Sequence, residues 1–116
     1  MSRWLRAWWP ALLYMAGIFT LSSISDFSNL GPKIMWQLVF DFDKVAHAIL
    51  YAGLAVMVLR ATQSPALSLP ITFLYGVSDE VHQYFVPGRS MSIADAIADL
   101  VGASIACGVW YWRKKP

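Results

Sequence analysis

The sequence has few charged residues and only one cysteine. Of its 116 residues only 14% are charged, whereas 58% are hydrophobic, and its mean hydropathy is +0.51. Soluble domains carry about 25% charged residues. The composition therefore predicts an integral membrane protein, and the length predicts one domain over residues 1–116. Because Cys107 is the only cysteine, an intrachain disulfide and a cysteine cluster for zinc or iron–sulfur are excluded.

Several motifs of soluble enzymes and nucleic-acid-binding proteins are also missing. The only basic run is Arg113-Lys114-Lys115, so nucleic acid is not expected as a partner. No phosphate-binding loop and no serine in a nucleophile elbow occur, which argues against nucleotide use and nucleophilic catalysis. Nor is there an H-E-x-x-H metal signature. We therefore expect no cofactor and no resident metal, although carboxylates and a histidine discussed below could hold a divalent cation.

The apolar runs predict an all-α fold, an integral membrane bundle of four transmembrane helices. They lie at about residues 8–23, 44–59, 66–86 and 91–112. The first run follows Arg3 and Arg6, as a secretory signal does, but polar Ser22-Ser23 follow it without a small-x-small cleavage site, which favours a spanning helix. Pro10 would then lie in its first turn, where the missing N–H costs nothing.

Basic residues near the predicted spans are divided unequally between the two sides. Because cytoplasmic loops carry an excess of Lys and Arg, we expect both termini in the cytoplasm. One side has Arg3, Arg6, Arg60, Arg113, Lys114 and Lys115, and the other has Lys33, Lys44 and Arg89.

Polar residues recur at helical spacing in three of the predicted spans. An ionisable group at bilayer depth costs about 2.5–3.5 kcal/mol on insertion scales. We therefore expect these residues to have hydrogen-bond or ion-pair partners and a functional or structural role. On a helix with 3.6 residues per turn each group falls within an arc of about 60–100°. We expect the three stripes to converge on one cup that opens outward. The groups are Lys44, His47 and Tyr51; Asp79, Glu80 and Gln83; and Asp95, Asp99 and Gly102.

The expected cup has more acids than bases. Lys44 and Arg89 are the available counter-charges for four carboxylates. Either some carboxylates hold a proton, or a cation enters the cup.

These residues also form three motifs with a defined spacing. They are Asp43-Lys44-x-x-His47-x-x-x-Tyr51-x-x-Leu54, Asp79-Glu80-x-x-Gln83-x-Phe85-x-Pro87-Gly88-Arg89, and Asp95 followed by Gly102. From Asp43 to about Gly108 the chain resembles the VanZ-like family of small bacterial membrane proteins. It departs from the family at Asp99, where asparagine is more frequent, and at Ala106, where a second glycine is common.

The resemblance implies a multi-pass protein of the bacterial cytoplasmic (inner) membrane with a role in the cell envelope. The family takes its name from a protein that confers low-level resistance to the glycopeptide teicoplanin. An effect on glycopeptide susceptibility is therefore implied as well. The resemblance names no reaction.

Each candidate site residue has a functional and a structural interpretation. Lys44 and Arg89 could each bind an anionic ligand or pair with Asp79, Glu80 and Asp95, and Lys44 could also extend to the interface. His47 could be an acid or base, a metal ligand or a packing residue. His82, about 60° from the Asp79 direction, is expected to pack between helices. The candidate catalytic residues are Glu80, Asp79, Asp95 and His47, and the candidate substrate-binding residues are Lys44, Arg89, Gln83, Tyr51 and Asp99.

Two functions remain open on these residues. In the first, the cup binds or modifies an anionic membrane lipid or a lipid-linked cell-wall precursor, as an enzyme or as a binding protein. In the second, the protein is a non-catalytic assembly protein whose buried ionic network fixes the packing of the bundle.

Overall fold

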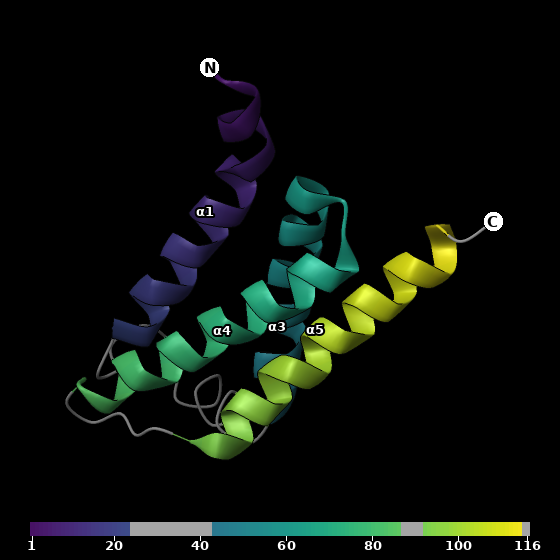
Figure 1. Ribbon diagram of the computed structural model, residues 1–116. Helices are drawn as coiled ribbons and strands as arrows, with labels where there is room; N and C mark the ends of the chain where they lie inside the picture. The colour runs from purple at the N-terminus through teal and green to yellow at the C-terminus, as the bar shows by residue number, and fades with distance from the viewer. Residues whose placement is uncertain (24–42, 87–91, 115–116) are drawn as a thin grey trace, which may run out of the picture.

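The computed structural model describes residues 1–23, 43–86 and 92–114, which form four α-helices (Figure 1). The helices are α1 (Arg3–Ser23), α3 (Asp43–Thr62), α4 (Pro65–Tyr84) and α5 (Ile93–Lys114). The all-α prediction is confirmed. The expectation for Pro10 is wrong, because α1 begins earlier and Pro10 lies inside it. The reason is Ser2, whose Oγ accepts a hydrogen bond from the Leu5 N–H at 3.1 Å and so caps the helix at its earlier start.

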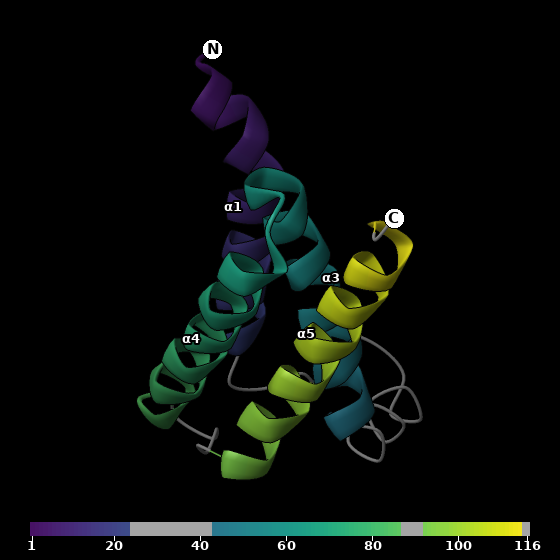
Figure 2. The same ribbon diagram turned by 45° about the vertical axis from the view of Figure 1, so that its right-hand side comes forward.

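The four helices pack as two central and two outer helices. α3 and α4 contact each other, and both contact α1 and α5. Helices that follow one another in the chain run in opposite directions, so the two termini and the connection between α3 and α4 lie toward the same end (Figures 1 and 2). The last turns of α1 and α4 and the first turns of α3 and α5 therefore meet at the other end.

The turn from α3 to α4 is built from three adjacent residues. Gln63 adopts a left-handed conformation with φ of 56°, and its N–H donates to the Leu59 carbonyl at 2.7 Å. Ser64 is extended and its side chain accepts from the Leu67 N–H, while Pro65 occupies the first helical position, where no N–H is needed. The chain therefore reverses direction here, and the N–H groups of Gln63 and Leu67 have hydrogen-bond partners.

Helices α3 and α5 approach each other closely at Gly102. A Cβ atom at this position would overlap the backbone carbonyl of Ala48. The neighbouring buried residues of α5 are also small, Ala98 and Ala103. Small residues therefore allow the two backbones into contact.

Helix α4 has its polar residues inside and its apolar residues outside. Leu67, Leu74 and Val81, seven residues apart, are 53%, 64% and 47% exposed. The buried face is small or polar throughout: Ser68, Thr72, Gly76, Asp79, Glu80 and Gln83. A helix in water has the opposite arrangement.

Two of the described helices have the length and composition of membrane spans. They are Lys44–Thr62 in α3 and Ile93–Lys114 in α5. On α5 the exposed surface includes an apolar row of Ile97, Val101, Ile105 and Val109. The second half of α4 includes the polar residues Asp79, Glu80, His82 and Gln83. The structure therefore has helices of membrane type in an all-α fold.

Candidate functional site

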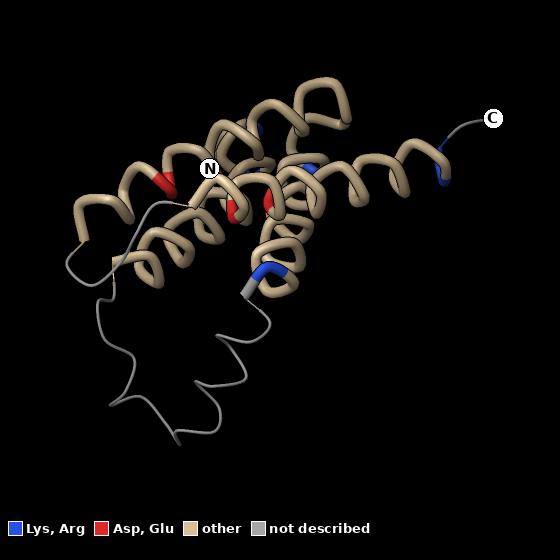
Figure 3. The backbone as a smooth tube through the Cα atoms, turned by 90° about the horizontal axis from the view of Figure 1, so that it is seen from below, with Lys and Arg blue, Asp and Glu red and all other residues tan. Residues whose placement is uncertain are grey.

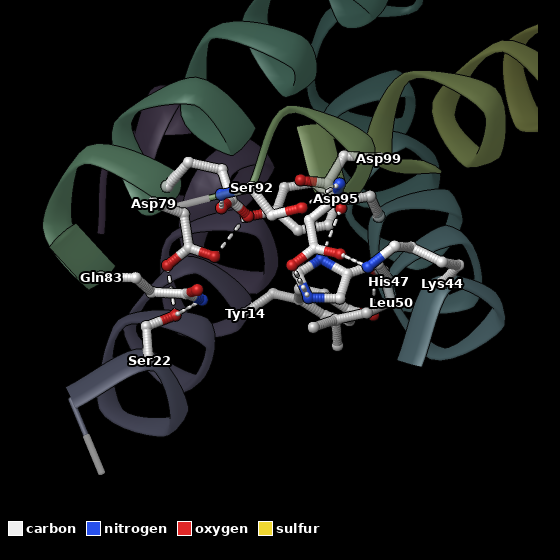
Figure 4. Close-up of polar contacts among 12 residues, drawn as sticks. Tyr14, Ser22, Lys44, His47, Leu50, Asp79, Gln83, Ser92, Asp95 and Asp99 are labelled. Carbon is white, nitrogen blue, oxygen red and sulfur yellow. Dashed lines mark hydrogen bonds and ion pairs between the residues drawn. The ribbon is translucent and has the colours of Figure 1, made fainter. Parts of the chain in front are cut away.

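Buried polar side chains gather at the end of the bundle that is away from the termini. Asp79, Glu80, Gln83, Asp95 and Asp99 are all buried, and Figure 4 shows how several of them point toward one another from different helices. We call the whole set the polar cluster. It consists of Ser22, Lys44, His47, Tyr51, Asp79, Glu80, Gln83, Ser92, Asp95 and Asp99.

His47 on α3 lies between the two aspartates of α5. Its Nδ1 is 2.8 Å from Asp99 Oδ1, and its Nε2 is 3.7 Å from Asp95 Oδ2. An ionised carboxylate only accepts hydrogen bonds, so Nδ1 donates to an ionised Asp99 in the tautomer that carries its proton there. This bond fixes the orientation of the ring and turns Nε2 toward Asp95.

Lys44 forms an ion pair with the other oxygen of Asp95. Its Nζ bonds Asp95 Oδ1, and the lysine side chain is 52% exposed whereas that of Asp95 is 10% exposed. Lys44 thus lies at the edge of the polar cluster.

Asp79 connects α4 to α1 and α3. Its Oδ2 accepts a hydrogen bond from the Tyr51 hydroxyl at 3.1 Å, and its Oδ1 accepts one from Ser22 Oγ. The Gln83 amide donates to the same Ser22 oxygen at 3.4 Å. The ring of Tyr51 stacks parallel to that of His47 with centroids 6.5 Å apart. Tyr51 therefore joins the Asp79 side of the polar cluster to the His47 side.

Glu80 binds the N-terminus of α5. Ser92 Oγ caps this helix by accepting from the Asp95 N–H at 3.2 Å. In a capping box the acid at the third helical position returns to the N–H of the cap residue. Here Glu80 Oε2 takes that N–H at 3.0 Å instead. Asp95 is consequently left for Lys44 and His47.

Two carboxylate oxygens of the polar cluster have no hydrogen-bond partner. They are Glu80 Oε1 and Asp99 Oδ2, both buried in the described part of the chain. A Cβ at Gly76 would lie 3.0 Å from Asp99 Oδ2, so the glycine provides the space for this carboxylate. Buried polar atoms usually have partners.

One group of side chains could hold a metal ion. His47, Glu80 and Asp95 each offer a ligand atom, and these atoms lie within 4.8 Å of one another. They come from α3, α4 and α5, so the packing of three helices defines the group.

The predicted convergence of polar stripes is present among the described residues. Arg89 lies outside the described residues. Ser22 and Ser92 belong to the polar cluster and are not among the site residues predicted from the sequence. Ser92-x-x-Asp95 has the spacing of a helix-capping motif and could have been found, whereas the contact of Ser22 depends on where α1 packs. The other predicted site residues all belong to the polar cluster: Lys44, His47, Tyr51, Asp79, Glu80, Gln83, Asp95 and Asp99.

His82 packs between helices, as expected. Its ring lies against Phe19 with centroids 4.4 Å apart, and its Nε2 is 2.9 Å from Ser23 Oγ. It therefore faces α1 and contributes no ligand atom to the group of His47, Glu80 and Asp95.

The family of the chain follows from its match to a family model. The model described as VanZ/LLP1 matches residues 3–114. The chain belongs to this family. The match includes all four described helices, and the resemblance of the three motifs is confirmed. No curated protein and no solved structure matches the chain.

In this VanZ/LLP1 protein Asp99 has a defined contact. It is fully buried and accepts the hydrogen bond from His47 Nδ1. The oxygen of an asparagine could accept the same bond. Aspartate differs from asparagine here by its charge. It adds one carboxylate to the polar cluster, and a charged acceptor forms a stronger hydrogen bond with a positively charged partner.

Proposed function

We propose that this VanZ/LLP1 protein crosses the bacterial cytoplasmic membrane four times with both termini in the cytoplasm. Exposed apolar side chains on α1 and α4 support two spans beyond the apolar helices α3 and α5. Examples are Leu13, 66% exposed, and Leu74, 64% exposed. A surface of this kind is stable against lipid and not against water.

The distribution of basic residues supports the orientation. Figure 3 shows the basic positions in blue and the acidic positions in red along the helices. The ends near the termini carry the larger number of basic residues, which favours the cytoplasmic side. The polar cluster then opens outward. The described basic residues at the end with the termini are Arg3, Arg6, Arg60, Arg113 and Lys114.

We propose further that the polar cluster binds or modifies an anionic envelope lipid or a lipid-linked cell-wall precursor. The observation that supports this most is the burial of four carboxylates in one place with an exposed lysine at its edge. Ionisable groups inside a membrane protein are costly and mark ligand sites or proton pathways. Lys44 and Arg89 would hold the anionic head group, and Glu80, Asp79, Asp95 or His47 would act as acid or base in a reaction.

Binding of an anionic lipid can be measured with the purified protein in detergent. Phosphatidylglycerol should raise the melting temperature of the wild type, and phosphatidylcholine should not. Lys44→Gln should abolish this increase, because it removes the exposed cation beside Asp95. Lys114→Gln is the control, since Lys114 lies over the Trp110 ring at the other end of α5. Equal stabilisation of both variants by phosphatidylglycerol would contradict the proposed site.

The envelope role is tested in a glycopeptide-sensitive Gram-positive host. Where the wild type lowers teicoplanin susceptibility, Glu80→Gln should remove the protection without lowering membrane abundance. Loss of protection in proportion to abundance would favour the assembly interpretation, because Glu80 would then act through its contact with Ser92 at the start of α5. Full protection by the variant would show that Glu80 carries no part of the function.

A further inference from the structure

We propose that His47, Glu80 and Asp95 form a binding site for one divalent cation. Their ligand atoms lie within 4.8 Å of one another. Four ligands at about 2.1 Å from a tetrahedral ion lie about 3.4 Å apart. The 3.7 Å between His47 Nε2 and Asp95 Oδ2 is already close to this value. Metal binding at this site does not depend on whether the polar cluster binds a lipid.

Glu80 supplies an oxygen that is available for a ligand. The residue is 3% exposed. Its Oε2 is held by the Ser92 N–H at 3.0 Å, and its Oε1 is buried without a hydrogen-bond partner within the described part of the chain. A buried carboxylate oxygen in this state is destabilising unless something binds it. Coordination by Oε1 would satisfy it without breaking the bond to Ser92.

His47 has the second contact that metal-binding histidines usually make. A ligating histidine donates its other ring N–H to a carboxylate or carbonyl, which fixes the tautomer and raises the basicity of the ligating nitrogen. His47 Nδ1 lies 2.8 Å from Asp99 Oδ1, and Asp99 is fully buried. The lone pair of Nε2 is then directed toward Asp95. The charge on Asp99 strengthens this arrangement compared with a neutral asparagine.

Asp95 can serve the metal and Lys44 together. Lys44 Nζ bonds Oδ1, whereas Oδ2 faces His47. Coordination through Oδ2 alone leaves the ion pair with Lys44 intact. Three protein ligands of this kind leave at least one position of the ion open for water or for a phosphate oxygen.

The ligand types indicate which cations bind. Imidazole favours ions such as Zn²⁺, whereas carboxylates also suit Mn²⁺ and Mg²⁺. Mg²⁺ and Ca²⁺ prefer oxygen ligands alone. One imidazole and two carboxylates therefore favour Zn²⁺ or Mn²⁺ over Mg²⁺. A divalent ion would also offset the charge of the two ligating carboxylates.

The test is titration of chelator-treated full-length protein in phosphate-free detergent with ZnCl₂, MnCl₂ and MgCl₂. Isothermal calorimetry should give one equivalent of Zn²⁺ or Mn²⁺ bound more tightly than Mg²⁺. Glu80→Gln and His47→Gln should each weaken binding at least tenfold, and Asp99→Asn should weaken it about 10–100-fold as a residue that orients the ligand. His82→Gln is the control and should bind as the wild type does, because His82 packs against Phe19 of α1 and contributes no ligand atom to the group.

Wild-type protein that binds none of the three ions would overturn the proposal. Binding that survives in both Glu80→Gln and His47→Gln, or that is lost equally in His82→Gln, would overturn it too. Where a variant does not fold, electron paramagnetic resonance of Mn²⁺ on the wild type decides, since coupling to an imidazole nitrogen is required. These titrations contain no added phospholipid, so failure of the lipid experiment leaves their outcome unaffected.

Discussion

At the scale of single residues, Glu80 and Ser92 determine what Asp95 can do. In a capping box the acid at the third position of a helix returns to the N–H of its own cap. Because Glu80 from α4 takes the Ser92 N–H at 3.0 Å, the carboxylate of Asp95 is available to Lys44 and His47. One contact between two helices thus converts a local capping residue into a member of the polar cluster.

Ser22 and Ser23 are neighbours that should differ in their contribution to stability. Ser22 is buried and donates to Asp79, whereas Ser23 is exposed. Ser22→Ala leaves a buried carboxylate oxygen without this donor and should lower the free energy of unfolding by about 1–3 kcal/mol. Ser23→Ala should change it by less than about 0.5 kcal/mol. Denaturant unfolding in detergent measures both, and equal effects would contradict the contact between α1 and Asp79.

At the scale of the elements, α5 depends on small residues where it crosses α3. Gly102→Ala should lower the free energy of unfolding by about 1–3 kcal/mol, because its Cβ would overlap the Ala48 carbonyl and force the helices apart. Gly108→Ala on the same helix meets no atom within 4 Å. It should be neutral or stabilising by about 0.5–1 kcal/mol, since alanine favours the helix. The same unfolding measurement decides, and a neutral Gly102→Ala would show that the two helices are further apart.

The turn between α3 and α4 offers a second test at this scale. Gln63 has a φ of 56°, a backbone conformation that is costly for L residues and not for glycine. Gln63→Gly should raise the free energy of unfolding by about 0.5–1 kcal/mol, and Gln63→Val should lower it. Thermal melting of the two variants beside the wild type gives the sign. A stabilising valine would contradict the left-handed conformation.

Helical periodicity and hydropathy predicted much of the fold and of the candidate site. The stripes on α3, α4 and α5 could be predicted because residues three and four positions apart share a face of one helix. The role of Ser22 could not, since it depends on how α1 packs against α4. Nor could the bond from Ser92 to Glu80, because it joins two helices at a distance that no periodicity specifies. Pro10 lies inside α1 and not in its first turn, because Ser2 caps the helix at an earlier start than the apolar run predicts.

At the scale of the whole molecule, the distribution of polarity is the reverse of that in a soluble bundle. The interior contains buried carboxylates and hydroxyls such as Asp79, Asp99 and Thr72, while large apolar side chains such as Leu13 and Ile105 face outward. In water this arrangement would expose apolar surface and desolvate charges at once. In lipid the outer surface is stable, and the polar cluster then holds the helices together from within.

The orientation of this bundle can be tested by cysteine labelling on intact cells. Tyr84, 64% exposed, lies at the end with the polar cluster, and Gln63 lies exposed in the α3–α4 turn at the other end. Each is replaced by cysteine in a Cys107→Ala background, which removes the buried native thiol. Tyr84→Cys should react with a membrane-impermeant maleimide, because the basic ends of the helices hold the opposite side in the cytoplasm. Gln63→Cys should react only after permeabilisation.

The reverse pattern would place the polar cluster on the cytoplasmic side, out of reach of ligands in the outer leaflet. Labelling of both positions on intact cells would mean that the α3–α4 turn also faces outward, and α4 would then not cross the membrane. Because α4 carries Asp79 and Glu80, that outcome would place their carboxylates at the membrane surface. Their burial among α1, α3 and α5 would then have to be explained by protein packing alone.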